Sequence, residues 1–179
     1  ESAFFWLYDS RIVNIAYNTF APTIGLVMNT ERSTLRCYLA DTGLLVSLAF
    51  GERGQMPVEV YERLLHDKLE SNMGMVMENI VAQMLIAAGH KLFFYNHIDR
   101  KDASNDMEID FLITKSIITS RKNICPIEVK SSTSFTITSL EKCMSKFNQS
   151  IGHAYVLHTG DVQLTDKITY LPLYMTGLL

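Results

Sequence analysis

The chain has 179 residues, of which 47% are hydrophobic and 20% charged, so it can bury a substantial core and is not intrinsically disordered. Its formal net charge of −3 at pH 7 argues against a protein that coats nucleic acid by bulk positive charge, but it leaves room for a local basic groove. No apolar run approaches the ~20 residues that span a bilayer, and no signal-peptide pattern opens the chain, so no membrane association is expected.

The cysteines indicate a reducing compartment. There are three of them, Cys37, Cys125 and Cys143, and no two have the Cys-x-x-Cys spacing of a redox or zinc motif. An odd number without such spacing predicts reduced thiols of a cytoplasmic protein, most of them packing residues.

The first part of the chain is predicted to form a small α+β segment. Residues 4–8 resemble the end of a helix, residues 11–18 and 35–39 are typical of short strands, and residues 42–49 form a short helix with Asp41 as its N-cap. A helix end followed by two strands fits the wing of a winged-helix module. A simple αββ appendage packed on a larger core fits the same pattern.

A domain boundary is expected at residues 51–57, a polar stretch with two glycines and one proline. It divides the chain into a segment of residues 1–56 and a domain of residues 57–179. Because the chain starts at Glu1 with apolar residues and no capping residue, we expect a fragment cut from a longer polypeptide.

The second part predicts an α/β domain with a mixed sheet flanked by helices. Apolar residues at three-and-four spacing indicate a helix over residues 72–88, which Gly89 ends. A further helix opens at Thr138, where Thr138 and Glu141 have the spacing of a capping box. The other expected elements are a helix over 57–70 and strands over 91–97, 108–114, 124–130, 154–158 and 168–174.

Two neighbouring strands carry the residues of chemical interest. Successive strand side chains point to opposite faces, so Glu128 and Lys130 share one face of the strand over 124–130. Asp110 lies on the preceding strand, and if the two strands pair, the three side chains converge on one patch. The residues expected to face away from Asp110 on its own strand are Ile109, Phe111 and Ile113.

Two carboxylates and a lysine at one point suit phosphodiester hydrolysis. Carboxylate oxygens are hard ligands for Mg²⁺ or Mn²⁺, and a nearby ammonium can orient the attacking water or offset charge on the phosphate. Glu78, on the preceding helix, can supply a further carboxylate. The alternative for Asp110, Glu128 and Lys130 is a solvated strand face with an ordinary ion pair, because Glu-x-Lys is a common tripeptide.

Three motifs resemble the PD-(D/E)XK nuclease superfamily in order and spacing. They are ENIVA at residues 78–82, EIDF at 108–111 and PIEVKS at 126–131. More narrowly, together with YLADTGLL at residues 38–45, they resemble the uncharacterised C-terminal domain that follows the ATPase module in many prokaryotic AAA-type ATPases. One departure is that Ile109, rather than proline, precedes the aspartate.

The resemblance implies a restriction-endonuclease-like core, with the order helix, three strands, helix, strand, preceded by part of a winged-helix segment. It makes Asp110 and Glu128 the ligands of Mg²⁺ or Mn²⁺, Lys130 the catalytic lysine and Glu78 the helix carboxylate. It also implies an ATP-binding P-loop domain upstream in the same polypeptide, since no P-loop motif occurs in this chain.

Three functions follow as hypotheses. The first is an accessory domain of a AAA-type ATPase, whose nuclease-like fold binds nucleic acid or a protein partner. The second is an active, metal-dependent DNA or RNA nuclease. The third is an oligomerisation domain without a ligand.

Overall fold

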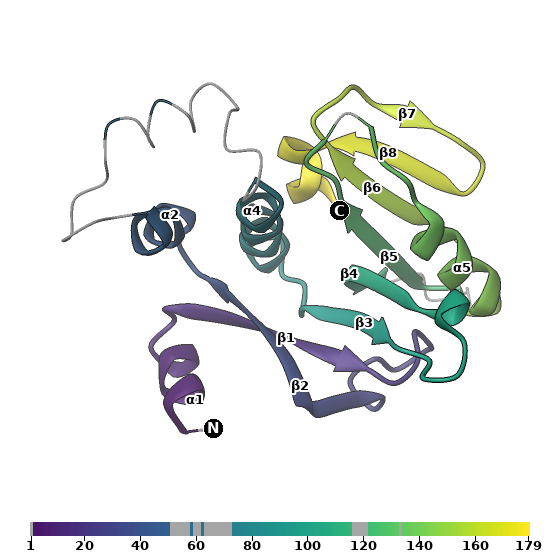
Figure 1. Ribbon diagram of the computed structural model, residues 1–179, viewed down its shortest axis with the longest axis horizontal. Helices are drawn as coiled ribbons and strands as arrows, with labels where there is room; N and C mark the ends of the chain where they lie inside the picture. Colours follow the sequence, from purple (N-terminus) through teal and green to yellow (C-terminus); the bar gives the residue numbers. More distant parts are fainter. Residues whose placement is uncertain (1, 51–57, 59–61, 63–72, 116–121, 133) are drawn as a thin grey trace.

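The molecule is built on one mixed sheet with helices on both faces (Figure 1). The computed structural model describes residues 2–50, 58, 62, 73–115, 122–132 and 134–179. The sheet has eight strands in the order β2-β1-β3-β4-β5-β6-β8-β7. This confirms the prediction of an α/β protein with a mixed sheet flanked by helices.

The elements follow one another along the chain in two groups. The first group is α1 (Ser2–Asp9), β1 (Val13–Thr19), β2 (Thr30–Leu39) and α2 (Thr42–Phe50). The second is α4 (Met73–Ala87), β3 (Phe93–His97), η1 (Ala103–Asn105), β4 (Met107–Thr114), β5 (Ile124–Val129), α5 (Thr138–Lys146), β6 (Ala154–His158), β7 (Gln163–Leu164), β8 (Ile168–Pro172) and η2 (Leu173–Leu178).

The strand directions bring several strand ends to one edge of the sheet. β3, β4 and β5 pair antiparallel in turn, and β6 and β8 run parallel to β5. The C-terminal ends of β3, β5 and β6 therefore lie at the same edge as the start of β4. This edge carries Asp110, Glu128 and Lys130.

The hairpin of β1 and β2 extends this sheet. β1 pairs antiparallel with β2 along most of its length and parallel with β3 through Tyr17 and Asn18, which face Phe93 and Phe94. The segment assigned to residues 1–56 thus contributes two strands to the sheet of the larger domain. Its assignment as part of a winged helix stays a prediction.

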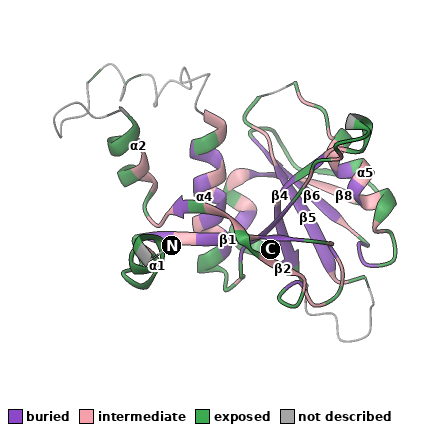
Figure 2. Ribbon diagram, turned by 60° about the horizontal axis from the view of Figure 1, so that its bottom comes forward, coloured by how far each residue is buried: buried purple, intermediate pink, exposed green. Residues whose placement is uncertain are grey.

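Each face of the sheet has its own hydrophobic core, and the central strands are buried on both sides (Figure 2). The buried residues on the α4 face include Val81, Leu85, Phe94, Phe111, Ile113, Ile127 and Leu157. Those on the α5 face include Tyr95, Ile109, Leu112, Ile124, Leu140, Cys143 and Val156. Burial of each such side chain contributes about 1.5–3 kcal/mol, so the two cores hold the strand ends in place.

Two amides on α4 fasten the chain between β2 and α2. The buried Asn79 side chain accepts from the Leu39 N–H at 2.7 Å and donates to the Leu39 carbonyl at 3.0 Å and to Thr42 Oγ1 at 2.9 Å. One turn later, Gln83 accepts from the Thr42 N–H and donates to the Ala40 carbonyl. These polar residues interrupt the apolar stripe of α4, and they satisfy backbone groups of Leu39, Ala40 and Thr42.

Some predicted helix ends are confirmed and one is wrong. The Leu44 N–H donates to Asp41 Oδ1 at 2.9 Å, as expected of an N-cap, and Gly89 has the positive φ of 90° expected after a helix. The capping box at Thr138 is wrong, because Thr138 is already helical and Ile137 is the N-cap, with no side-chain hydrogen bond. The predicted linker over 51–57 and most of the helix over 57–70 lie outside the described residues.

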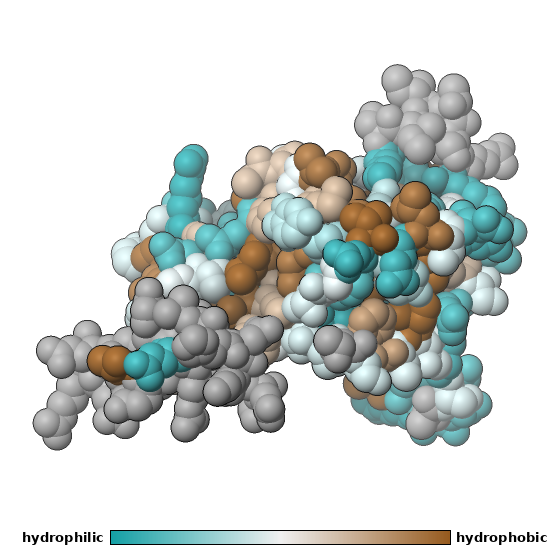
Figure 3. All heavy atoms as spheres, turned by 90° about the horizontal axis from the view of Figure 1, so that it is seen from above, coloured by the Kyte–Doolittle hydropathy of each residue, from teal (hydrophilic) through white to brown (hydrophobic). Residues whose placement is uncertain are grey.

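The state of the cysteines and the surface can be compared with the predictions from composition. Cys37, Cys125 and Cys143 are free thiols, and the last two are buried. In the view from above, hydrophobic atoms are scattered among hydrophilic ones (Figure 3). Among the described helices, none has the length and apolar character needed to cross a membrane.

Candidate functional site

A register shift in β4 sets the direction of Asp110. Phe93 faces Leu112 and Tyr95 faces Ile109. Phe94, the single residue between Phe93 and Tyr95, therefore lies opposite two residues of β4, Asp110 and Phe111. Such a bulge bends the strand and redirects a side chain, and bulges are frequent beside active sites. It makes the predicted alternation wrong: Ile109 packs on the α5 face, whereas Phe111 and Ile113 pack on the α4 face.

Asp110 links β4 to β5 just beyond the last residues that the two strands pair, Phe111 and Ile127. Its Oδ2 accepts a hydrogen bond of 2.8 Å from the Val129 backbone N–H, and its Oδ1 lies 3.9 Å from Arg36 Nη1. Burial raises the pKa of Asp110, while the Val129 N–H and the charges of Arg36 and Lys130 act in the opposite direction. One oxygen of this carboxylate is thus used by the fold, and the other faces the site.

Glu128 and Lys130 form an ion pair at the end of β5. The Lys130 ammonium lies 2.7 Å from Glu128 Oε2, and only 3% of the Glu128 side chain is exposed. That same oxygen is buried, and the Lys130 ammonium offsets its negative charge. Burial raises the pKa of Glu128, against the effects of Lys130 and of the Leu140 backbone N–H in the first turn of α5.

The structure therefore brings the predicted residues to one end of two adjacent strands. Asp110 accepts from the backbone of Val129, which stands between Glu128 and Lys130 in the chain. The negative charge of Asp110 also contributes to the raised pKa of Glu128. Asp110 approaches from the α4 side, whereas Glu128 lies on the α5 side beside Leu140, so the two carboxylates reach the strand ends from different faces of the sheet.

Glu78 joins this group from α4. Its Oε2 lies 3.5 Å from the hydroxyl of Tyr38 on β2, at the limit of a hydrogen bond. Burial and the negative charge of Asp110 raise the pKa of Glu78 to about 7, although Arg36 lowers it. A carboxyl group that titrates near neutral pH is suited to exchange protons with a bound ligand.

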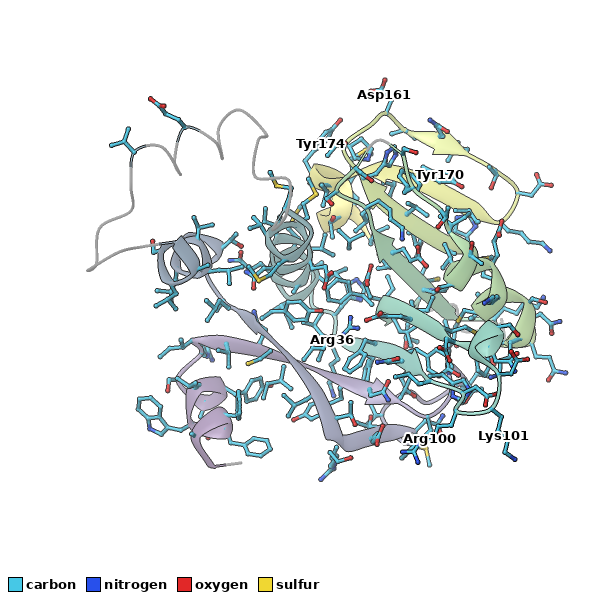
Figure 4. The ribbon with its side chains drawn as sticks, in the orientation of Figure 1. Arg36, Arg100, Lys101, Asp161, Tyr170 and Tyr174 are labelled. Carbon is cyan, nitrogen blue, oxygen red and sulfur yellow. The ribbon has the colours of Figure 1, made fainter. Side chains whose placement is uncertain are left out.

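Arg36, on β2, is a residue of the site that the motif search missed. Its guanidinium pairs with Glu108, approaches Asp110 and stacks over the ring of Phe94 at 4.4 Å from the centroid. Figure 4 shows Arg36 directed inward between α4 and the strands, whereas Arg100 and Lys101 point outward. The available signal was strand periodicity, because Arg36 lies two residues before Tyr38 and so shares its face of β2.

The donor set fits a divalent cation held by few protein ligands. In the described part of the chain, no three His, Cys, Asp or Glu side chains are grouped closely enough to hold a metal ion by themselves. Mg²⁺ commonly binds through one or two carboxylates, with water and phosphate oxygens completing its coordination. The Glu128 carboxylate, paired with Lys130, and Asp110 Oδ1, which lies 3.9 Å from Arg36, supply oxygens of that kind.

The raised pKa of Glu78 predicts that the free energy of unfolding falls as pH rises through the weakly acidic range. Its pKa rises from 4.5 to about 7 on folding, so between these values the folded protein holds a proton that the unfolded chain has released. Stability therefore decreases with pH across this window and is level above it. Allowing for partial exposure, we expect the wild type to lose about 1–2 kcal/mol more than Glu78→Gln between pH 4.5 and 7.5.

Urea unfolding at several pH values measures this difference. Glu141→Gln, at an exposed glutamate of α5, is the matched control and is expected to keep the wild-type slope. Equal slopes for Glu78→Gln and the wild type would mean that Glu78 is not the group that titrates.

Comparison with known proteins identifies the family through the second part of the chain. Neither the curated proteins nor the solved structures give a match. A family model described as a domain of unknown function, DUF4143, matches residues 73–175, which is more than half of the chain. The match includes Glu78, Asp110, Glu128 and Lys130, whereas Arg36 and Tyr38 precede it. The chain belongs to the DUF4143 family.

Proposed function

We propose that this chain is a nuclease-like accessory domain that binds nucleic acid through a phosphodiester group at the Asp110–Glu128–Lys130 site. The observation that carries the proposal is that Asp110 binds the Val129 backbone N–H, directly between Glu128 and Lys130, which form an ion pair at the end of β5. The order α4-β3-β4-β5-α5-β6 supports a PD-(D/E)XK-type core, with the aspartate on the second strand and Glu-x-Lys on the third.

Binding would use both signs of charge in the site. A divalent cation held by Asp110 Oδ1 and the Glu128 carboxylate would neutralise phosphate charge and act as a Lewis acid. Lys130, kept in position by its contact with Glu128, would donate to a phosphate oxygen. Because the chain as a whole is acidic, this local arrangement, rather than net charge, would provide the attraction.

An upstream ATPase is the expected context. The DUF4143 family is usually found in AAA ATPase proteins. Nucleic acid held at the Asp110–Glu128–Lys130 site would then be presented to the ATPase module, so that ATP hydrolysis could be coupled to a bound strand.

Hydrolysis is the second candidate, and the environment of Glu78 favours it. A general base works best with a pKa near the ambient pH, and the pKa of Glu78 is raised to about 7. Glu78, whose pKa responds to the charge of Asp110, would take a proton from the water that attacks the phosphorus; the bond from phosphorus to the leaving sugar oxygen would break, and that oxygen would take a proton from solvent. Lys130 would then stabilise the negative charge that develops on the phosphate.

Fluorescence anisotropy with labelled single- and double-stranded DNA and RNA tests binding, with Mn²⁺, with Mg²⁺ and with chelator. We expect divalent cation to strengthen binding, and Asp110→Asn and Lys130→Ala each to weaken it about tenfold or more, because each removes a group that holds the phosphate. Asp161→Asn and Lys101→Ala change the same residue types at exposed positions and are expected to bind as the wild type does.

The result that overturns the proposal is binding that neither Asp110→Asn nor Lys130→Ala changes, or no binding to any of these nucleic acids. Denaturing gels of the same samples test hydrolysis. Cleavage that persists in both variants would come from another site or a contaminant and would exclude the second candidate.

A further inference from the structure

Arg36 occupies the approach to the one oxygen of Asp110 that the fold leaves open. Asp110 Oδ2 accepts a hydrogen bond of 2.8 Å from the Val129 N–H, so Oδ1 keeps more of its lone-pair capacity for a cation. Arg36 Nη1 lies 3.9 Å from Oδ1. The guanidinium therefore stands beside the position where a cation held by Asp110 would bind.

Contacts with Phe94, Glu108 and Tyr38 keep the guanidinium there. It stacks over Phe94 at 4.4 Å and pairs with Glu108 through Nη2, and 22% of the Arg36 side chain remains exposed. Glu108 itself is far more exposed, at 60% of its side chain. Because Glu108 faces solvent, Arg36 can keep this partner while its other nitrogen turns away from Asp110.

We propose that Arg36 competes with a divalent cation for Asp110 Oδ1, and that a phosphate which draws Arg36 away from Asp110 thereby favours cation binding. This inference rests on the proposed cation and phosphate site. A positive guanidinium a few ångströms from a doubly charged ion weakens the binding of that ion, because like charges repel most where water is partly excluded.

The competition links the two ligands of the site. A guanidinium binds phosphate oxygens in a bidentate fork, so a phosphodiester offers Arg36 a better partner than a 3.9 Å contact. By linkage, a strand that moves Arg36 raises cation affinity, and the cation raises strand affinity by the same factor. Arg36 would thus make cation binding depend on nucleic acid.

Mn²⁺ binding, followed by the loss of the free-ion electron paramagnetic resonance signal, tests the inference without any measure of activity. We expect Arg36→Gln to bind Mn²⁺ about tenfold more tightly than the wild type, since the competing charge is gone. A single-stranded oligonucleotide should raise Mn²⁺ affinity in the wild type by a larger factor than in Arg36→Gln. Arg32→Gln, at an exposed arginine of the same strand, should behave as the wild type does.

Two further variants make the result decisive. Arg36→Met keeps the aliphatic stem over Phe94 and replaces Arg36→Gln if that variant does not fold; the same gain in affinity is expected. Asp110→Asn should remove Mn²⁺ binding in every background. If it does so while Arg36→Gln and Arg36→Met bind no more tightly than the wild type, competition is overturned and the cation site stands. If no variant shows Mn²⁺ binding that depends on Asp110, the cation site fails as well.

Discussion

Phe111→Ala is expected to lower the free energy of unfolding by about 4 kcal/mol, the largest effect of any single change considered for this protein. Phe111 is fully buried on the α4 face, next to Asp110 at the bulge, and its ring lies 5.3 Å from that of Tyr38. Its removal would leave a cavity under the hairpin of β1 and β2. Tyr38 would lose a packing partner, so the contact between Tyr38 and Glu78 should loosen too.

Urea unfolding at pH 7 measures the loss. Phe20→Ala, at a phenylalanine that is 68% exposed, is the matched control and should stay within about 0.5 kcal/mol of the wild type. A cost for Phe111→Ala below about 1.5 kcal/mol would mean that the core around the bulge can collapse to fill the space.

Asn79→Ala is expected to cost about 2–3 kcal/mol, because it removes three hydrogen bonds of a buried side chain at once. Two of them satisfy the backbone N–H and carbonyl of Leu39, the last residue of β2. Without Asn79 these groups are left unpaired, and β2 is held less firmly against α4. Since β2 carries Arg36 and α4 carries Glu78, the change should also loosen the candidate site.

The same unfolding experiment separates this effect from a simple loss of side-chain polarity. Asn148→Ala, at an exposed asparagine after α5, is expected to be nearly neutral. Asn79→Asp keeps the acceptor for the Leu39 N–H but sets a buried carboxylate against the Leu39 carbonyl, so a cost at least as large as that of Asn79→Ala is expected. Wild-type stability of Asn79→Ala would show that water can replace all three bonds.

The site draws on both parts of the chain. Four of its charged residues, Glu78, Asp110, Glu128 and Lys130, lie within the family match over residues 73–175. Arg36 and Tyr38 come from β2, which pairs with β1 at the edge of the same sheet. A variant limited to the matched residues would therefore lack the guanidinium beside Asp110 and the hydroxyl beside Glu78.

Local sequence patterns were sufficient to predict the features that depend on one helix or one strand alone. Alternation along β5 placed Glu128 and Lys130 together at its end, where they form an ion pair. Asp41 and Gly89 marked helix ends correctly because capping depends on a few neighbouring residues. The order of helices and strands likewise followed from periodicity, which is a property of each segment.

Only the tertiary structure decided how these elements meet. The bulge at Asp110 depends on the register of β4 against β3, which is set by pairing between distant residues and reverses the facing of Ile109 relative to Phe111. In the first turn of α5, the Leu140 N–H binds the carboxylate of Glu128, which comes from β5. The predicted capping box does not form. Arg36 reaches Asp110 from 74 positions earlier in the chain, and no local pattern records a contact that the folded sheet alone creates.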